Sequence, residues 1–311
     1  MPHFGRIVTS TEEKITKEGA KKSRQVNKGD LILSNSMSYG LPYIMGIDGY
    51  IHDGWFVLKN FENTFDKDYL CNLLISSAIQ NQYKRLAAGG VVQNISSDLV
   101  NSVSVSIPTM MEQKKISSLL NLIDERIATQ NKIIEKLESL IKGIADKLFQ
   151  TARETKLLLE LAPNITSGTD KNGSGTIPLY GSTGIIGKVK NASQKGNIVL
   201  VARVGTIGTV QYVKEPCGVS DNALIVEAGE MTKYIYHFLK TYKFAHITSG
   251  TTQPLITASS LKKIAVPTYD IERQTQIVLC LNILERKLDI EKQYLSDIAM
   301  MKQYLLHQMF I

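Results

Sequence analysis

Apolar residues recur at alternating spacings of four and three positions along two stretches of the chain. The first stretch contains Ile116, Leu120, Ile123, Ile127, Ile134, Leu137 and further apolar positions up to Leu148. The second contains Ile277, Leu281, Leu284, Leu288, Leu295 and further positions up to Leu305. This spacing is the heptad pattern of coiled-coil helices. The sequence therefore predicts two long helices, over 111–151 and 271–311. A helix of about 38 residues is roughly 57 Å long, too long to fold back within a small domain.

Each apolar stripe is interrupted by a polar residue at an equivalent position, Gln130 in the first and Glu291 in the second. Because a globular segment separates the two helices, an antiparallel pairing would bring these two residues together at its midpoint. A buried polar residue there would fix the register at some cost in stability. Lys302 weakens the far end of the second stripe. In the alternative interpretation, each stripe packs on a different protein or forms an ordinary core.

The segments that precede the two helices repeat one pattern of turns and strands. Gly29–Leu33 reappears as Gly196–Leu200, in each case a glycine turn that leads into an apolar strand. A polar turn and an apolar strand at 52–57 match those at 220–225, and the order is kept throughout. Similarity at a nearly constant long offset indicates duplicated structural units. We expect an α+β fold with two tandem mixed α/β domains, 1–110 and 152–270, each followed by a long helix, the helices pairing as an antiparallel coiled coil.

Charge and cysteine usage narrow the class of protein. Lys and Arg total 36 against 29 acidic residues, for a net charge of +7, which favours a polyanionic partner. The three cysteines lie far apart and form no CxxC pair, so a zinc site is not expected. No run approaches the ~18 apolar residues of a membrane span, and the first residues do not resemble a signal peptide. We expect a cytoplasmic protein with no membrane partner.

The sequence lacks the motifs of the relevant enzymes. It contains no Asn/Asp-Pro-Pro-Tyr/Phe motif of an adenine methyltransferase and no phosphate-binding loop, since Gly184–Val189 has the wrong spacing. The five histidines show no metal-ligand spacing. His237 and His246 are expected at the surface or half-buried. These observations predict a non-catalytic protein without a metal.

The layout resembles the DNA specificity subunit of Type I restriction-modification systems over nearly the whole chain. The resemblance rests on an ordered set of segments: Pro108, Glu112–Ile116, Leu122–Asp124 and Leu137–Phe149, their second copy from Pro267 to Phe310, and Ile177–Gly184. It implies two target recognition domains that each read one half of a split DNA site, with the paired helices as a ruler. It also implies two modification (methyltransferase) subunits docked on the helices, and restriction subunits. S-adenosylmethionine, ATP and Mg would belong to those partners, and this chain would need no cofactor.

The first repeat departs from the family pattern at its beginning. About 40 residues, including Pro178–Tyr180, separate the first long helix from Gly196, whereas only 28 residues precede Gly29. We therefore expect a first recognition domain that is shortened at its N-terminus.

Residues that contact DNA are expected to be Lys and Arg on phosphates and Asn, Gln, Arg, Ser or Thr on base edges. The candidates are Asn35, Ser36, Tyr39, Lys84, Arg85, Gln93 and Asn94 in the first domain, and Tyr180, Ser182, Thr183, Lys188, Lys190, Arg203, Thr206 and Gln253 in the second. Arg203 aligns with Asn35, and a base-reading position would explain such an exchange. A structural role for Arg203 is the alternative.

Two other functions are compatible with the sequence. One is the specificity subunit of a fused restriction-modification enzyme, whose partner carries methylation and cleavage on one chain. The other is a coiled-coil scaffolding protein that does not read DNA, which weak salt dependence of duplex binding would favour.

Overall fold

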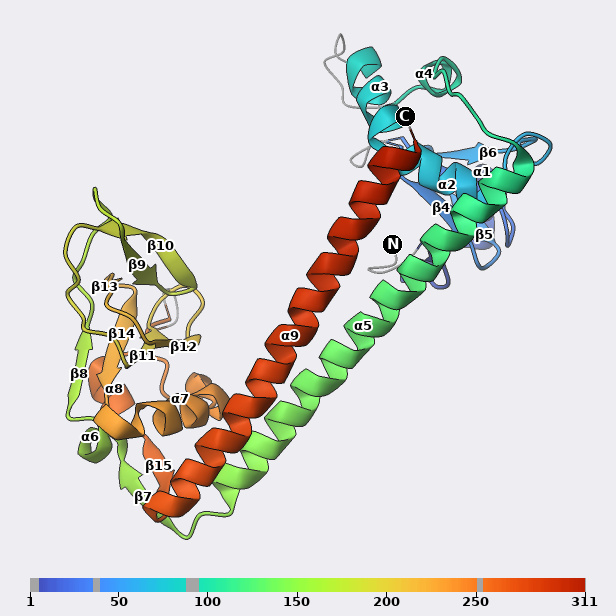
Figure 1. The fold of residues 1–311 in the computed structure, drawn as a ribbon. Helices are drawn as coiled ribbons and strands as arrows, with labels where there is room; N and C mark the ends of the chain where they lie inside the picture. The colour runs from blue at the N-terminus through green and yellow to red at the C-terminus, as the bar shows by residue number, and fades with distance from the viewer. Residues whose placement is uncertain (1–5, 36–39, 88–94, 251–253, 311) are drawn as a thin grey trace. The chain divides into compact units, whose positions relative to one another are not determined.

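The computed structural model describes residues 6–35, 40–87, 95–250 and 254–310 (Figure 1). The chain forms two compact units. The first unit consists of Met1–Ile134 and Ile290–Ile311, and the second consists of Glu135–Asp289. Two long helices, α5 (Met110–Gln150) and α9 (Ile271–Met309), contribute to both units.

The second unit contains a four-stranded sheet in the order β12-β11-β14-β8, a three-stranded sheet β10-β9-β13 and a pair β15-β7. Its strands are β7 (Glu154–Leu157), β8 (Asn164–Ser167), β9 (Ile177–Gly181), β10 (Gly184–Val189), β11 (Ile198–Ala202), β12 (Val210–Val213), β13 (Gly218–Val219), β14 (Ala223–Glu227) and β15 (Ala265–Thr268). Its helices are α6 (Leu158–Leu161), α7 (Thr232–Thr241) and α8 (Ala258–Lys262), with short 3-10 turns η1 (Gly229–Met231) and η2 (Phe244–His246).

The core of the second unit lies between its four-stranded sheet, α7 and the long helices. The central strand β11 is buried along its whole length, as a strand with neighbours on both edges and both faces should be. Phe149 from α5 packs edge-on against Tyr234 and Phe238 of α7. Ile277 of α9 belongs to the same cluster. The long helices are therefore part of this core.

The first unit contains a four-stranded sheet in the order β1-β4-β3-β6 and a pair β2-β5. Its strands are β1 (Ile7–Val8), β2 (Arg24–Val26), β3 (Leu31–Ser34), β4 (Pro42–Met45), β5 (Gly49–Ile51) and β6 (Trp55–Leu58). Its shorter helices are α1 (Lys17–Lys22), α2 (Lys67–Ile75), α3 (Ser77–Ala87) and α4 (Ser97–Asn101). The side chain of Asp66 caps α2 by accepting a hydrogen bond from the backbone N–H of Tyr69.

The two units repeat the same backbone arrangement. Gly29 and Gly196, which open the equivalent strands β3 and β11, both have positive φ angles, 96° and 92°. The N–H of Asn35 donates to the carbonyl of Gly54 in the first unit, and the N–H of Arg203 donates to that of Asn222 in the second. The tandem α+β organisation predicted from the sequence is confirmed.

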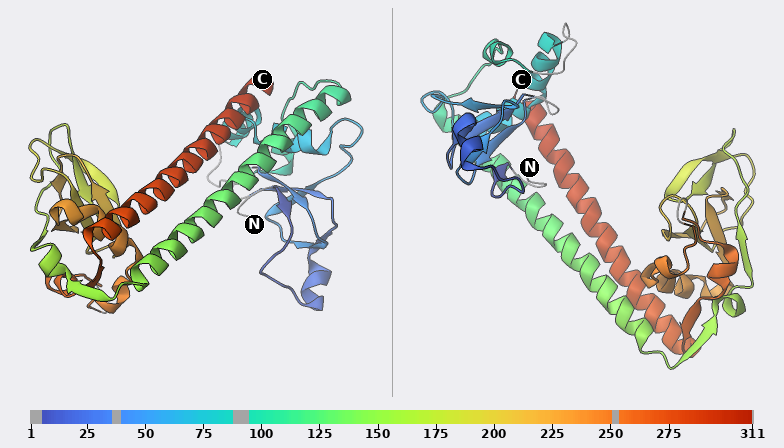
Figure 2. Two further views of the ribbon diagram at one scale, coloured as in Figure 1. Left: turned by 60° about the horizontal axis from the view of Figure 1, so that its bottom comes forward. Right: turned by 180° about the vertical axis from the view of Figure 1, so that it is seen from behind.

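The long helices pair in opposite directions, as Figures 1 and 2 show. Within the first unit, Asp124 of α5 pairs with Lys302 of α9, and Arg126 lies over the ring of Tyr294. The partner number falls as the α5 number rises, so the pairing is antiparallel. The predicted antiparallel coiled coil is confirmed.

Candidate nucleic-acid interface

The β9–β10 hairpin and the loop after β11 come together in the second unit. The side-chain N–H of Gln211, on β12, donates to the carbonyls of Gly181 (2.9 Å) and Ser182 (3.3 Å). The hydroxyl of Thr206 donates to the carbonyl of Ser182 at 3.4 Å. These contacts hold the turn of the hairpin against the loop. The arrangement brings together two predicted residues, Ser182 and Thr206, and Gln211, which the sequence reasoning missed.

Arg203 lies at the end of β11, where the chain enters that loop. Its Nη1 donates to the hydroxyl of Ser167 at 2.9 Å, while its Nε is buried without a hydrogen-bond partner among the described residues. Its backbone N–H and carbonyl are bonded to Asn222 and Ile256. A buried donor without a partner is costly, so the guanidinium is held in place and keeps one donor unused.

The other predicted residues of the second unit spread over the hairpin. Thr183 is exposed in its turn, and the exposed side chains of Lys188 and Lys190 lie at and just after the end of β10. Tyr180 is half-buried on β9 and packs on the cluster below the hairpin. Gln253 lies outside the described residues.

A groove of about 840 Å³ lies beside the loop after β11. Its lining includes Ile207 and Gly208 from the loop and Lys243, His246 and Thr248 from the segment after α7. Gly208 has a φ of 80°, and a Cβ atom there would lie 2.7 Å from the ring of Phe244. Glycine at this position therefore lets the loop approach the groove. Cations and hydroxyls on its walls suit a phosphate backbone.

The candidate residues of the first unit do not form one cluster. The side-chain N–H of Asn35 donates to the backbone carbonyl of Asp53 at 2.6 Å, which closes a turn within the unit. Lys84 and Arg85 are exposed in the last turn of α3. Four further candidates lie outside the described residues: Ser36, Tyr39, Gln93 and Asn94.

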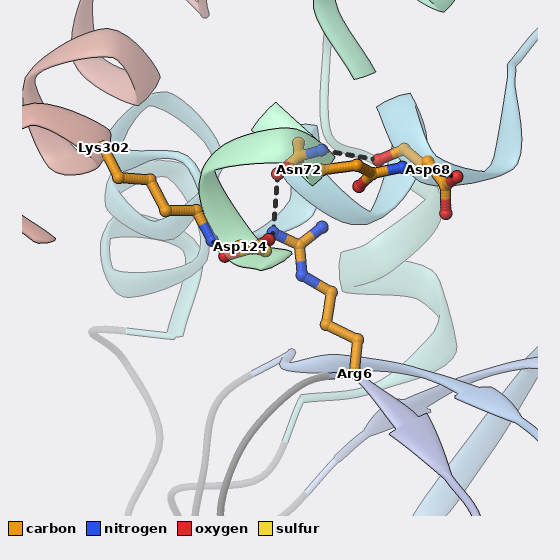
Figure 3. Close-up of polar contacts among 6 residues, drawn as sticks. Arg6, Asp68, Asn72, Asp124 and Lys302 are labelled. Atoms are coloured by element: carbon orange, nitrogen blue, oxygen red, sulfur yellow. Dashed lines mark hydrogen bonds and ion pairs between the residues drawn. The ribbon is translucent and has the colours of Figure 1, made fainter. Parts of the chain in front are cut away.

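A polar cluster fastens α2 and the N-terminal segment of the first unit to the long helices (Figure 3). Arg6 donates to the side-chain carbonyl of Asn72 at 2.6 Å and lies 3.6 Å from the carboxylate of Asp124. Lys302 binds the same carboxylate, and Asn121 donates to Asp68 at 2.8 Å. Burial lowers the pKa of Lys302, against which the hydrogen bond from Asp124 acts. Two cations from distant parts of the chain thus share one carboxylate.

The second unit carries a matching cluster between α7 and α9. His237 lies 3.0 Å from Asn282 and 3.8 Å from Glu285, and Lys240 donates to Glu285 at 2.5 Å. Burial lowers the pKa of His237, while Glu285 acts in the opposite direction. In both units, a helix that follows the main sheet is thus fastened to a long helix by polar groups.

The helix-pairing residues lie on the facing sides of α5 and α9. Leu120, Ile123 and Ile134 are buried, as are Ile277 and Leu281. The half-buried members are Ile116, Ile127, Leu137, Leu284, Leu288 and Leu295. The side-chain N–H of Gln130, itself buried, donates to the backbone carbonyl and the carboxylate of Glu291.

The cysteines and acidic residues show no sign of a reactive centre. Burial raises the pKa of Cys71 to about 12 and that of Cys217 to about 11, so both remain thiols at neutral pH. Among the described residues, no cluster of three or more His, Cys, Asp or Glu side chains could hold a metal. Over the same residues, no helix is both long and apolar enough to cross a bilayer.

Two repeated α/β units joined by an antiparallel helix pair, with polar loops at the strand ends, are the architecture of a protein that presents two recognition surfaces. Residues 4–139 and 157–300 match the Type I restriction modification DNA specificity domain. The chain belongs to this family, whose members are non-catalytic specificity subunits.

Known relatives agree with this assignment. The HindI specificity subunit of Haemophilus influenzae is 27% identical over 136 residues, which cover 42% of this chain and 29% of the relative. The matched region thus spans less than a third of that curated relative. The S subunit of M. genitalium has a similar fold, with a TM-score of 0.62 at 19% identity over 94% of this chain and 85% of the other. A chain solved in work on complex assembly and conformational transition of the type I R-M system has a TM-score of 0.63 at 15% identity, over 91% of this chain and 82% of the other.

Proposed function

We propose that this chain is the DNA sequence-specificity subunit of a Type I restriction-modification complex and reads a bipartite DNA site in the cytoplasm. The observation that carries the proposal is the repeat itself, because two units with the same backbone plan offer two equivalent readers. The recognition domains would span 1–110 and 152–270, and the helices over 111–151 and 271–311 would set their separation. A fixed separation makes the gap between half-sites a property of the protein.

The hairpin turn and the loop after β11 are the proposed reading surface of the second domain. Ser182, Thr206, Gln211 and Arg203 supply the hydroxyl, amide and guanidinium groups that recognise base edges. The exposed Lys188 and its neighbour Lys190 would contact phosphates. In the first domain the same roles fall to Asn35, Lys84 and Arg85 and to the candidates outside the described residues.

The outer faces of the long helices are the proposed docking surface for two modification (methyltransferase) subunits. Leu119, Leu122 and Met301 are exposed on these helices within the first unit, as are Leu140 and Ile283 within the second. Exposed apolar groups of this kind are typical of protein interfaces. Restriction subunits would join the resulting complex, and S-adenosylmethionine, ATP and Mg would be bound by the partners.

Co-expression with a candidate modification subunit tests the proposal. We expect a stable complex that binds duplex DNA with strong salt dependence and methylates adenine in a defined sequence. Leu122→Asp and Ile283→Asp should prevent assembly while leaving the isolated chain folded, and Lys136→Asp, on an exposed position of α5, is the matched control. A complex that forms without salt-dependent DNA binding would favour the scaffolding function.

A further inference from the structure

An edge of the main sheet that is covered in the second unit is open in the first. In the second unit β8 pairs with β14 from Leu224↔Ser167 to Glu227↔Asn164, and β14 is buried over four of its five residues. The equivalent strand of the first unit, β6, pairs with β3 on one side. Within the described residues no strand pairs with its other side, and all four of its residues are only half-buried.

The same difference occurs at the strand before each long helix. In the second unit β15 pairs with β7, and Ile264 and Val266 are 2% and 0% exposed. Their counterparts Val105 and Ile107 are 40% and 38% exposed, and no described strand pairs with 104–107. Both missing partners correspond to one continuous segment of the second unit, Glu154–Ser167, which forms β7, α6 and β8.

A groove in the first unit lies where this segment would pack. It has a volume of about 410 Å³, and its apolar walls include Tyr69, Leu73, Ile116 and Phe310 beside residues 104–108. Their counterparts in the second unit, Tyr234, Phe238, Ile277 and Phe149, belong to a closed core. Three side chains of the Glu154–Ser167 segment complete that core: Leu158, Ala162 and Ile165. The internal repeat therefore shows what kind of group fills this place.

We propose that this groove and the open edge of β6 bind a strand-turn-strand segment supplied by a separate polypeptide. The partner segment resembles Glu154–Ser167: a short strand beside 104–107, a turn that buries apolar side chains in the groove, and a second strand added to β6. Addition of a strand to an open sheet edge satisfies backbone groups that are otherwise unpaired, and pockets for side chains give specificity. Binding completes the first unit on the plan of the second.

A synthetic peptide with the sequence of residues 152–168 is the direct probe, used with the full chain and without DNA. We expect saturable one-to-one binding, and hydrogen exchange slowed about tenfold at Trp55–Leu58 and at 104–107. A peptide in which Asp replaces the residues equivalent to Leu158 and Ile165 should not bind.

Variants of the chain locate the binding site. Val105→Asp and Ile107→Asp lie at exposed positions that tolerate a charge, and both should abolish binding of the peptide. Ile185→Asp, at an exposed position of β10 in the second unit, should leave it unchanged. Binding that survives Val105→Asp and Ile107→Asp would overturn the proposed site.

A chain extended after Ile311 by residues 152–168 distinguishes supply by another polypeptide from supply by the same chain. Protection of β6 in the extended chain, together with no binding of the free peptide, would overturn supply by a separate polypeptide. Absence of protection in both cases would overturn the groove as a site for such a segment. None of these readouts involves DNA, so their failure leaves the proposed specificity function intact.

Discussion

Gln130 and Glu291 face each other between the two long helices, and the amide of Gln130 donates to both the carboxylate and the backbone carbonyl of Glu291. Gln130 is buried, although each residue interrupts an otherwise apolar stripe. A polar pair at such a position satisfies its hydrogen bonds in one alignment of the helices only. The pair therefore selects a register among those that the apolar residues allow.

Replacement of Gln130 by Leu should destabilise the first unit. The variant leaves the carboxylate of Glu291 facing an apolar group, at a cost of about 1–3 kcal/mol. The double variant Gln130→Leu/Glu291→Leu should recover this loss because both polar groups are removed together. Denaturant unfolding measures both effects. A Gln130→Leu variant as stable as the unchanged chain would show that the pair does not contribute.

The cluster at Asp124 should behave as a coupled unit. Asp124→Asn leaves Lys302 and Arg6 without their shared carboxylate, whereas Lys302→Met leaves Asp124 paired with Arg6. We expect the first variant to lower stability more than the second. The double variant should lose less than the two single losses together, which a double-mutant cycle measures. Additive losses would contradict the coupling.

The second unit should lose stability in mild acid because of His237. Burial holds the pKa of His237 below its ordinary value near 6.5. Between the two pKa values the unfolded chain binds a proton that the folded chain does not, so stability falls as the pH drops below about 6.5. His237→Asn, which introduces the residue found at the equivalent position 72, should flatten this decline in urea unfolding followed against pH. His246→Asn, at an exposed histidine, is the control and should leave the decline unchanged.

Lys188 should contribute to DNA affinity but not to sequence preference. Lys188→Ala removes a charge proposed to contact phosphate, so binding should weaken by a similar factor on all duplexes and the salt slope should fall by about one. Arg203→Ala should instead reduce the preference between target and unrelated duplexes. Titrations at several salt concentrations separate the two effects. A change in preference for Lys188→Ala would assign that residue to base reading.

The repeat and the helices could be predicted from the sequence because both depend on local patterns. Heptad spacing fixes which face of each helix is apolar, and the two polar interruptions at Gln130 and Glu291 indicated the alignment. Lys302 appeared to weaken the second stripe, yet in the structure it pairs with Asp124, a residue far away in the sequence. No local pattern indicates such a partner.

The polar contacts between distant segments could not be predicted in the same way. The expectation that His237 lies at the surface or half-buried was wrong, since it is 3% exposed beside Asn282 of α9. Gln211 was missed because a single polar residue within a strand has no signal of its own. Its role depends on how the β9–β10 hairpin folds against β12, which only the tertiary structure provides.

Mapping adenine methylation across a genome tests the central proposal most directly. The chain is co-expressed with its modification subunit, and methylated positions are read with and without the pair of variants Arg203→Ala and Lys188→Ala. We predict a split motif with a constant gap, in which Arg203→Ala relaxes one half-site and leaves the other unchanged. Methylation at a single undivided motif, or none despite a stable complex, would contradict two recognition domains that read one bipartite site.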